Sequence, residues 1–161
     1  MESATNRMSK SNAVTLILFI VLTVAGGSLI GFFSIPGPWY QALEKPSFNP
    51  PNWVFGPVWT VLYVLIGIAG ARVWIRERGG VLPKLWFAQI AFNYLWPLVF
   101  FTMQRPDLAL PVLLAMLASI LAFIFVAWDR DRPSALMFIP YAIWVSFAGL
   151  LNAAIWWLNR T

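Results

Sequence analysis

The stretch AVTLILFIVLTVAGGSLIGFF, residues Ala13–Phe33, carries no charged side chain. A helix needs about 20 consecutive apolar residues to cross the hydrocarbon core of a membrane, so this stretch is long enough to span it. Four further apolar stretches follow, namely Trp53–Ala71 with a continuation to Trp74, Leu85–Met103, Leu108–Trp128 and Ser134–Leu158. Charged residues lie between these stretches or near their ends. We therefore predict an all-α, polytopic membrane protein that folds as a bundle of five transmembrane helices.

The composition excludes several classes of function. Apolar residues make up 60% of the 161 residues and charged residues only 11%, whereas a soluble domain carries about 25% charged residues. Charge this sparse cannot cover a water-facing surface, which excludes a cytosolic domain, a disordered chain and a nucleic-acid-binding arm. The chain also contains no Cys and no His, which excludes disulfides, thiolate chemistry, zinc hydrolases and Ser–His–Asp triads. Residues 1–161 are expected to form a single membrane domain without a metal site.

The distribution of positive charge predicts how the bundle is oriented. With five spans, the N-terminus shares a side with the second and fourth connections. That side carries eight of the eleven Lys and Arg residues, which are Arg7, Lys10, Arg72, Arg76, Arg78, Lys84, Arg130 and Arg132. The other three are Lys45, Arg105 and Arg160. Because basic residues concentrate on the cytoplasmic side, we predict a cytoplasmic N-terminus and a C-terminus on the opposite side.

The connection between the first two spans differs from the others. Residues 34–52 read SIPGPWYQALEKPSFNPPN and hold five prolines together with Trp39, Tyr40 and Phe48. Proline fixes φ and removes a backbone donor, so this loop should be semi-rigid. We predict that it forms a lid over the bundle, with a short helical turn at Leu43–Lys45. The alternative is a connector that caps helix ends, which would need neither this length nor these aromatic residues.

Aromatic and amide side chains recur at helical spacing inside the second and third spans. Trp59 and Tyr63 are four residues apart and share a helix face, although an interfacial aromatic belt is the alternative for Trp59. Gln89 and Asn93 share a face of the third span, and Trp96 lies one turn further. Polar side chains inside hydrocarbon must find partners. We expect an interhelical hydrogen bond for Gln89, whereas for Asn93 such a bond and a place in a binding pocket are equally favoured.

The third and fifth spans carry two further features. Pro97 should kink the third span because it removes one backbone hydrogen bond. In the fifth span Trp144, Ala148 and Leu151 recur along one helix face. A Trp beside small residues in mid-span suits a flat apolar ligand better than tight packing does. No His, Cys or carboxylate lies in mid-span, so the sequence holds no conventional catalytic pair.

Small residues four apart predict close contacts between helices. They occur as Gly27-x-x-x-Gly31 and Gly67-x-x-x-Ala71, and as a stripe in the fourth span made of Ala115, Ala118, Ser119 and Ala122. Such residues let helices approach closely in lipid. We interpret them as packing within the bundle, with the seam of a dimer as the alternative.

Three segments together resemble the translocator protein family, TspO/MBR, which is also called the peripheral benzodiazepine receptor family. They are WYQALEKPSFNPPNWVFGPVWTVLY at 39–63, QIAFNYLWPLVFF at 89–101 and IPYAIWVSFAGLLN at 139–152. The likeness extends from Gly26 to about Arg160. The resemblance implies a five-helix bundle, often dimeric, with a pocket beneath the first loop. Members bind porphyrins, haem, sterols and synthetic isoquinoline or benzodiazepine ligands.

The resemblance also implies roles for individual residues. Trp59 matches the Trp of the second span that is implicated in porphyrin binding and breakdown, and Trp144 matches its partner in the fifth span. Other matching ligand positions are Asn93, Trp96, Ala148 and Leu151. The complete candidate ligand-binding set is Trp39, Phe55, Trp59, Tyr63, Asn93, Trp96, Trp144, Ala148 and Leu151. No catalytic residue is expected unless bound porphyrin is photo-oxidised, in which case Trp59 and Trp144 take part.

Two departures from the family pattern favour a bacterial type of member. The run Leu151–Asn152–Ala153 lacks the Tyr that follows Leu–Asn in the sterol motif of animal members, which argues against sterol recognition at this segment. Leu108 stands where animal members carry a Trp, so a ligand contact there is lost.

We therefore expect a membrane receptor or sensor that binds tetrapyrroles such as protoporphyrin IX and related flat apolar ligands, and that requires no cofactor. Metal-free porphyrin is favoured because the chain lacks the usual axial ligands of haem, and its propionates can reach Lys45 or Arg105. The alternatives are light- and oxygen-dependent porphyrin degradation and passive transport of tetrapyrroles or sterol-like lipids. Ion-coupled transport would need intramembrane charges that are missing. The expected partners are such a small molecule, membrane lipids and a second copy of the chain, but no nucleic acid.

Overall fold

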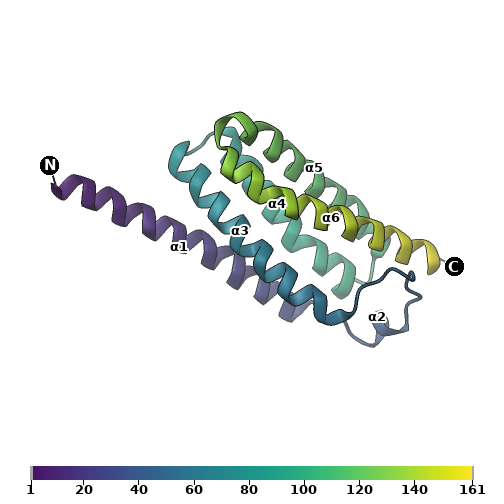
Figure 1. The fold of residues 1–161 in the computed structure, drawn as a ribbon. Helices are drawn as coiled ribbons and strands as arrows, with labels where there is room; N and C mark the ends of the chain where they lie inside the picture. Colours follow the sequence, from purple (N-terminus) through teal and green to yellow (C-terminus); the bar gives the residue numbers. More distant parts are fainter. Residues whose placement is uncertain (1, 161) are drawn as a thin grey trace.

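The computed structural model describes residues 2–160, with side chains described from Lys10 onward. This part of the chain is helical and contains no strand (Figure 1). The long helices are α1 (Glu2–Phe33), α3 (Phe55–Arg76), α4 (Val81–Pro97), α5 (Pro106–Arg130) and α6 (Arg132–Leu158). The shorter elements are α2 (Pro38–Ala42), the 3₁₀ turn η1 (Asn52–Val54) and the π-helical turn η2 (Leu98–Thr102).

The predicted all-α bundle with five spans is confirmed. Within the described residues, five helical segments are long and apolar enough to cross a membrane. Around the bundle the long helices follow the order α1, α3, α6, α5, α4, and α4 also contacts α1. Figure 1 shows the two chain ends at opposite ends of the bundle. The orientation across the membrane and the dimer stay predictions.

Several helices begin earlier than the apolar stretches predicted. α5 begins at Pro106 instead of Leu108, and α6 begins at Arg132 instead of Ser134. In both cases a proline occupies the first turn, where its missing N–H costs no hydrogen bond. α4 begins at Val81 instead of Leu85. Hydropathy marks the part of a helix that can lie in hydrocarbon, so it does not locate the polar turns that extend beyond it.

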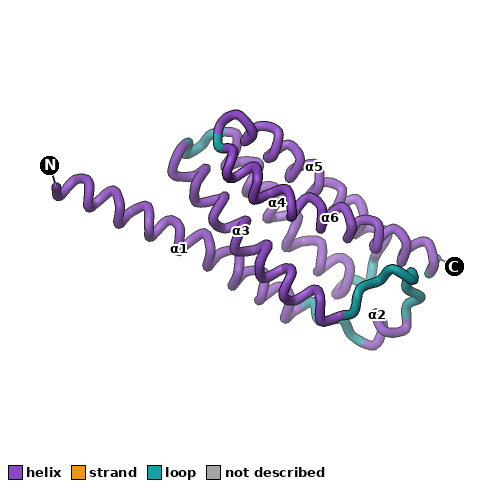
Figure 2. The backbone as a smooth tube through the Cα atoms, in the orientation of Figure 1, coloured by secondary structure: helices purple, strands orange, loops and turns teal. Residues whose placement is uncertain are grey.

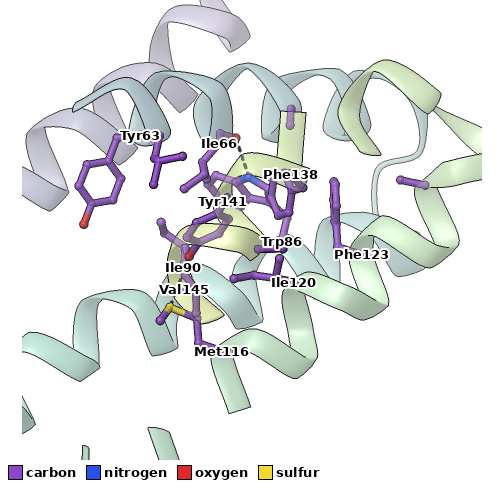
Figure 3. Close-up of a cluster of buried hydrophobic side chains, with 14 of the residues drawn as sticks. Tyr63, Ile66, Trp86, Ile90, Met116, Ile120, Phe123, Phe138, Tyr141 and Val145 are labelled. Atoms are coloured by element: carbon purple, nitrogen blue, oxygen red, sulfur yellow. Dashed lines mark hydrogen bonds between the residues drawn. The ribbon is translucent and has the colours of Figure 1, made fainter. Parts of the chain in front are cut away.

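The largest fully buried side chain, Trp86, organises the middle of the bundle. Its indole N–H donates a 2.8 Å hydrogen bond from α4 to the carbonyl oxygen of Ile66 on α3, as Figure 3 shows. Phe123 of α5 stacks on Phe138 of α6 with ring centroids 4.0 Å apart. Aromatic packing and a buried hydrogen bond thus contribute to the contacts among these four helices.

The small residues of α1, α3 and α5 pack only partly as expected. A Cβ atom on Gly67 would lie 2.8 Å from the Cα of Ile20, so the glycine lets the two helices approach closely. The Thr23 hydroxyl crosses this contact and donates to the carbonyl oxygen of Tyr63 at 2.7 Å. Gly31 has no neighbouring atom within 4 Å of its Cβ position, and Ala118 is exposed. For these two residues the interpretation as packing within the bundle is wrong.

The long loop contains a helical turn, but not at the predicted place. The turn is α2, and Leu43 directly after it is extended, with φ −67° and ψ 141°. Pro38 has the φ that a helix start needs, whereas Pro46 disfavours a helical conformation at Lys45. Figure 2 shows the remaining loop as an irregular segment beside α2, near the C-terminus.

The α-helical hydrogen-bond pattern of the third span changes at Pro97, where the sequence predicted the loss of a backbone bond, whereas the kink itself stays a prediction. α4 ends at Pro97 and continues directly into the π-helical turn η2. The backbone N–H of Met103 donates to the carbonyl oxygen of Leu98, five residues earlier. Proline removes a donor from the α-helical ladder, and the wider turn restores pairing beyond it.

The buried carboxylate of Asp131 joins the connection between α5 and α6 to α3. It accepts hydrogen bonds from Arg72 Nε at 3.1 Å and Nη2 at 2.7 Å, and Ser134 donates to it. Burial raises the pKa of the Asp131 carboxyl, but the hydrogen bonds from Arg72 and Ser134 and the charges of Arg72 and Arg76 hold it below its usual value. The ionised form of Asp131 therefore stabilises the fold.

Replacing this carboxylate should destabilise the protein in a pH-dependent way. A lowered pKa means that the stabilisation is present above the unfolded value of about 3.9 and is lost as the pH falls through the folded value. We expect Asp131→Asn to lower the free energy of unfolding at pH 7 by about 2 kcal/mol. The difference from the unmodified protein should shrink on acidification. Thermal unfolding in detergent, followed by circular dichroism at pH 7 and at about pH 2, measures both effects.

Asp129→Asn serves as the control, because Asp129 is exposed. Equal destabilisation by Asp131→Asn and Asp129→Asn would show that the ion pair with Arg72 contributes nothing specific.

Candidate functional site

A cavity of about 550 Å³ lies among α1, α3, α4 and α6, beneath the loop of residues 34–52. Seven members of the predicted set line it, namely Phe55, Trp59, Tyr63, Asn93, Trp96, Trp144 and Ala148. Sequence reasoning missed the other lining residues, which are Gly27, Ser28, Ile30, Gly31, Ser34, Pro36, Tyr40, Asn52, Gly56, Thr60, Pro97 and Phe101. The tertiary structure thus gathers residues from four separate spans, as well as the loop, around one space.

Two predicted residues lie outside the cavity wall. Trp39 packs edge-to-face on Phe100, with ring centroids 6.0 Å apart, and its neighbour Tyr40 lines the cavity instead. Leu151 is buried in α6 but is absent from the wall.

A chain of hydrogen bonds forms the inner end of the cavity. The Tyr63 hydroxyl donates to Asn93 Oδ1 at 2.9 Å, and Asn93 Nδ2 donates to the Tyr141 hydroxyl at 2.7 Å. Tyr141 in turn donates to Gln89 Oε1 at 2.8 Å. The interhelical bond predicted for Gln89 is therefore confirmed. Asn93 combines both roles that its sequence position suggested, because it bonds to α3 and α6 and also lines the cavity.

Aromatic rings form the walls of the cavity. Trp59 stacks on Tyr63 with centroids 5.4 Å apart and an interplanar angle of 30°. Trp144 meets Phe55 edge-to-face at 5.7 Å. The indole of Trp96 is held by a 2.9 Å hydrogen bond from its N–H to Asn152 Oδ1. Rings held in this way present flat apolar surface without needing to be ordered on binding.

Two polar groups of the wall have no partner among the described residues. The indole N–H of Trp144 and the hydroxyl of Ser34 are both buried and form no hydrogen bond. A buried donor without a partner costs about 1–3 kcal/mol. Because both atoms are buried even from the cavity, an acceptor on a bound molecule would remove that cost only after a shift of the side chain. Spacing along α6 identifies Trp144, but no sequence signal distinguishes its free N–H from the bonded N–H of Trp96.

The nearby cations differ in their availability. Lys45 Nζ lies 4.6 Å from the ring centroid of Tyr40 and donates to the carbonyl oxygens of Gln41 and Leu43. Arg105 instead forms a two-point ion pair with Asp107, with Nη2 2.6 Å from Oδ2. Burial raises the pKa of the Tyr40 hydroxyl, so this wall residue stays neutral. Of the two predicted cations, Lys45 is the better placed to meet an anionic group at the cavity.

The wall favours binding over bond-breaking chemistry. It contains no carboxylate, and among the described residues no cluster of acidic side chains can hold a metal ion. What the site offers is aromatic surface, amide and hydroxyl groups, and the buried, unpartnered indole N–H of Trp144. Such a site suits a flat, largely apolar molecule with at least one hydrogen-bond acceptor.

Comparison with known proteins agrees with this architecture. The sequence profile of the TspO/MBR family matches residues 19–158. The chain is 42% identical to Protein CrtK of Rhodobacter capsulatus, over 91% of this chain and 95% of that protein. It is 38% identical to the tryptophan-rich sensory protein of Cereibacter sphaeroides, over 88% and 91% of the two chains. It is also 38% identical to the human translocator protein, over 73% of each chain. The chain is an integral, multi-pass membrane protein and belongs to the TspO/MBR family.

Proposed function

We propose that this protein is a membrane receptor or sensor that binds a metal-free tetrapyrrole such as protoporphyrin IX in the cavity. The observation that carries the proposal is the unpartnered indole N–H of Trp144 in a wall made largely of aromatic rings. Trp59 and Trp96 supply faces on which a flat ring stacks. The N–H of Trp144 supplies a directed contact to an acceptor on that ring or its substituents.

The donor set favours porphyrin over haem. The chain has no His and no Cys, and these are the usual axial ligands of haem iron together with Met and Tyr. Tyr40 and Tyr63 line the cavity, but Tyr63 already donates its proton to Asn93. The cavity of about 550 Å³ falls within the usual range of about 300–1,000 Å³ for small-molecule sites.

A sensory role is supported by the name of one relative. The relative from Cereibacter sphaeroides is called a tryptophan-rich sensory protein. We assign the same kind of role to this chain because binding is the chemistry that its cavity wall supports. In this role, occupancy of the cavity reports the tetrapyrrole content of the membrane to a partner.

A second candidate function is light-driven oxidation of bound porphyrin by dioxygen. It is favoured by one observation, which is that two tryptophans of the cavity wall, Trp59 and Trp144, would both lie beside a bound chromophore. Trp59 also stacks on Tyr63, so two oxidisable rings are in contact.

Removing the free donor while keeping a ring should weaken binding. We expect Trp144→Phe to raise the dissociation constant of protoporphyrin IX by about tenfold, because the loss of one hydrogen bond and part of an aromatic contact amounts to about 1.4 kcal/mol. An absorbance titration of the detergent-solubilised protein in the dark measures this. Trp157→Phe is the control, because Trp157 is 61% exposed and lies outside the cavity. Unchanged affinity in Trp144→Phe would contradict the proposed contact between the Trp144 indole N–H and the ligand.

The role of Lys45 can be tested with two ligands. Lys45→Met keeps an unbranched side chain but removes the charge, so binding of protoporphyrin IX should weaken by up to about fivefold, as expected for an exposed ion pair. Binding of the dimethyl ester, which lacks the two carboxylates, should not change. Arg105→Gln should affect neither ligand, because Asp107 already pairs with Arg105. An equal loss for acid and ester would mean that Lys45 acts through the loop and not through a carboxylate.

Illumination separates the two candidate functions. If the protein only senses porphyrin, the absorbance of the bound pigment should stay constant in light and air. Bleaching that depends on the protein and is lost in both Trp59→Phe and Trp144→Phe would favour the photo-oxidative function. The variants are compared at saturating porphyrin, so that weaker binding is not mistaken for slower bleaching.

A further inference from the structure

The exposed residues of the cavity wall gather on one side of it. Of the residues that line it, six are exposed: Ser28, Gly31, Pro36, Asn52, Gly56 and Thr60. All six lie on α1, on α3 or in the loop segments directly attached to these two helices. The lining residues from α4, η2 and α6 are buried or half-buried. The exposed residues therefore outline a slot between α1 and α3.

Glycines keep this slot open. Neither Gly31 on α1 nor Gly56 on α3 has any atom within 4 Å of its Cβ position, so each faces open space. Deeper in the bundle the same two helices are in contact, where Gly67 meets Ile20 and the Thr23 hydroxyl bonds to α3. The helices thus touch at their middle and leave a gap at the end that holds the cavity.

The other seams around the cavity are closed by specific contacts. Between α1 and α4, the Tyr94 hydroxyl donates to the carbonyl oxygen of Leu22 at 2.7 Å. Between α1 and η2, the Thr102 hydroxyl donates to the carbonyl oxygen of Phe33 at 3.3 Å. Between α3 and α6, the rings of Phe55 and Trp144 meet. Passage through any of these seams would require breaking contacts that the slot lacks.

The loop above the cavity is also fastened. The side-chain amide of Asn159, after the end of α6, accepts a hydrogen bond from the backbone N–H of Glu44 and donates one to its carbonyl oxygen, both at 2.9 Å. Tyr40 is buried against Phe100 and Phe101. The loop is therefore a fixed cover over this part of the cavity, and opening it would expose buried aromatic surface.

The depth of the slot shows what it faces. Ser28 and Gly31 lie within the first span, and Gly56 and Thr60 lie within the second. At 1.5 Å per residue, these positions lie within about 12 Å of the span ends. That places the slot at the acyl chains just below the headgroups of one leaflet. Ser28, Gly31, Gly56 and Thr60 are therefore expected to face lipid, whereas Pro36 and Asn52 lie at the loop end of the slot.

We propose that the ligand reaches the cavity sideways from the membrane, through the slot between α1 and α3, while the loop of residues 34–52 stays closed. This rests on the proposed function, namely binding of a flat apolar ligand in the cavity. The inference narrows the ligand class to molecules that partition into the outer part of a lipid leaflet. Protoporphyrin IX, with an apolar ring and two carboxylates, is the probe of that class.

The test is to narrow the slot from either side and to measure rates. We expect Gly31→Leu and Thr60→Phe each to slow both association and dissociation of protoporphyrin IX by about tenfold, which corresponds to an added barrier of about 1.4 kcal/mol. Stopped-flow tryptophan quenching in detergent micelles gives the association rate, and dilution into empty micelles gives the dissociation rate. A merely damaged site would release the ligand faster, so slower release is the distinguishing result.

Two matched variants complete the experiment. Ala25→Leu adds the same bulk to an exposed position of α1 outside the cavity and should leave both rates unchanged. Asn159→Ala unfastens the loop and should also leave them unchanged. Faster association and dissociation in Asn159→Ala, or unchanged rates in both slot variants, would overturn the lateral route while leaving the binding function intact. If the unmodified protein shows no saturable quenching, the binding function itself fails, and the route fails with it.

Discussion

The hydrogen-bond chain from Tyr63 through Asn93 and Tyr141 to Gln89 is the contact on which the site depends. Hydrocarbon offers no water to polar groups, so amide and phenol side chains in a membrane bundle must bond to one another. Here they join α3, α4 and α6 at a single level. Above that level the same helices carry the walls of the cavity. This hydrogen-bond chain therefore sets the distance between the cavity walls and closes the inner end of the site.

The two ends of the bundle are built differently. At one end, Asp131 holds the connection between α5 and α6 to α3 through Arg72. At the other end, aromatic side chains from the spans leave a cavity among them, and the loop covers it. Charge pairing makes the first end rigid. The second end combines a fastened cover with a slot between α1 and α3.

The cavity and the slot support one physical picture of ligand recognition. Stacking on fixed rings favours a flat apolar ligand, and the unpartnered N–H of Trp144 favours a ligand that carries a hydrogen-bond acceptor. A molecule of this kind concentrates in lipid, so a route from the leaflet would give it access without passing through water. Lys45 lies close to Tyr40 of the cavity wall, where an anionic group on such a ligand could be met.

Hydropathy along the chain was enough to predict the five spans, and helical spacing together with the family resemblance predicted seven of the residues that line the cavity. Hydropathy and residue spacing are properties of one helix at a time. In a long apolar helix, the helical period alone determines which residues share a face. The tertiary structure alone decided that Tyr40 lines the cavity where Trp39 was expected, and that Leu151 is buried outside the cavity wall. It also decided that Trp96 has a partner for its N–H while Trp144 has none. These outcomes, like the open space at Gly31, depend on distances between helices, which the periodicity of a single helix does not encode.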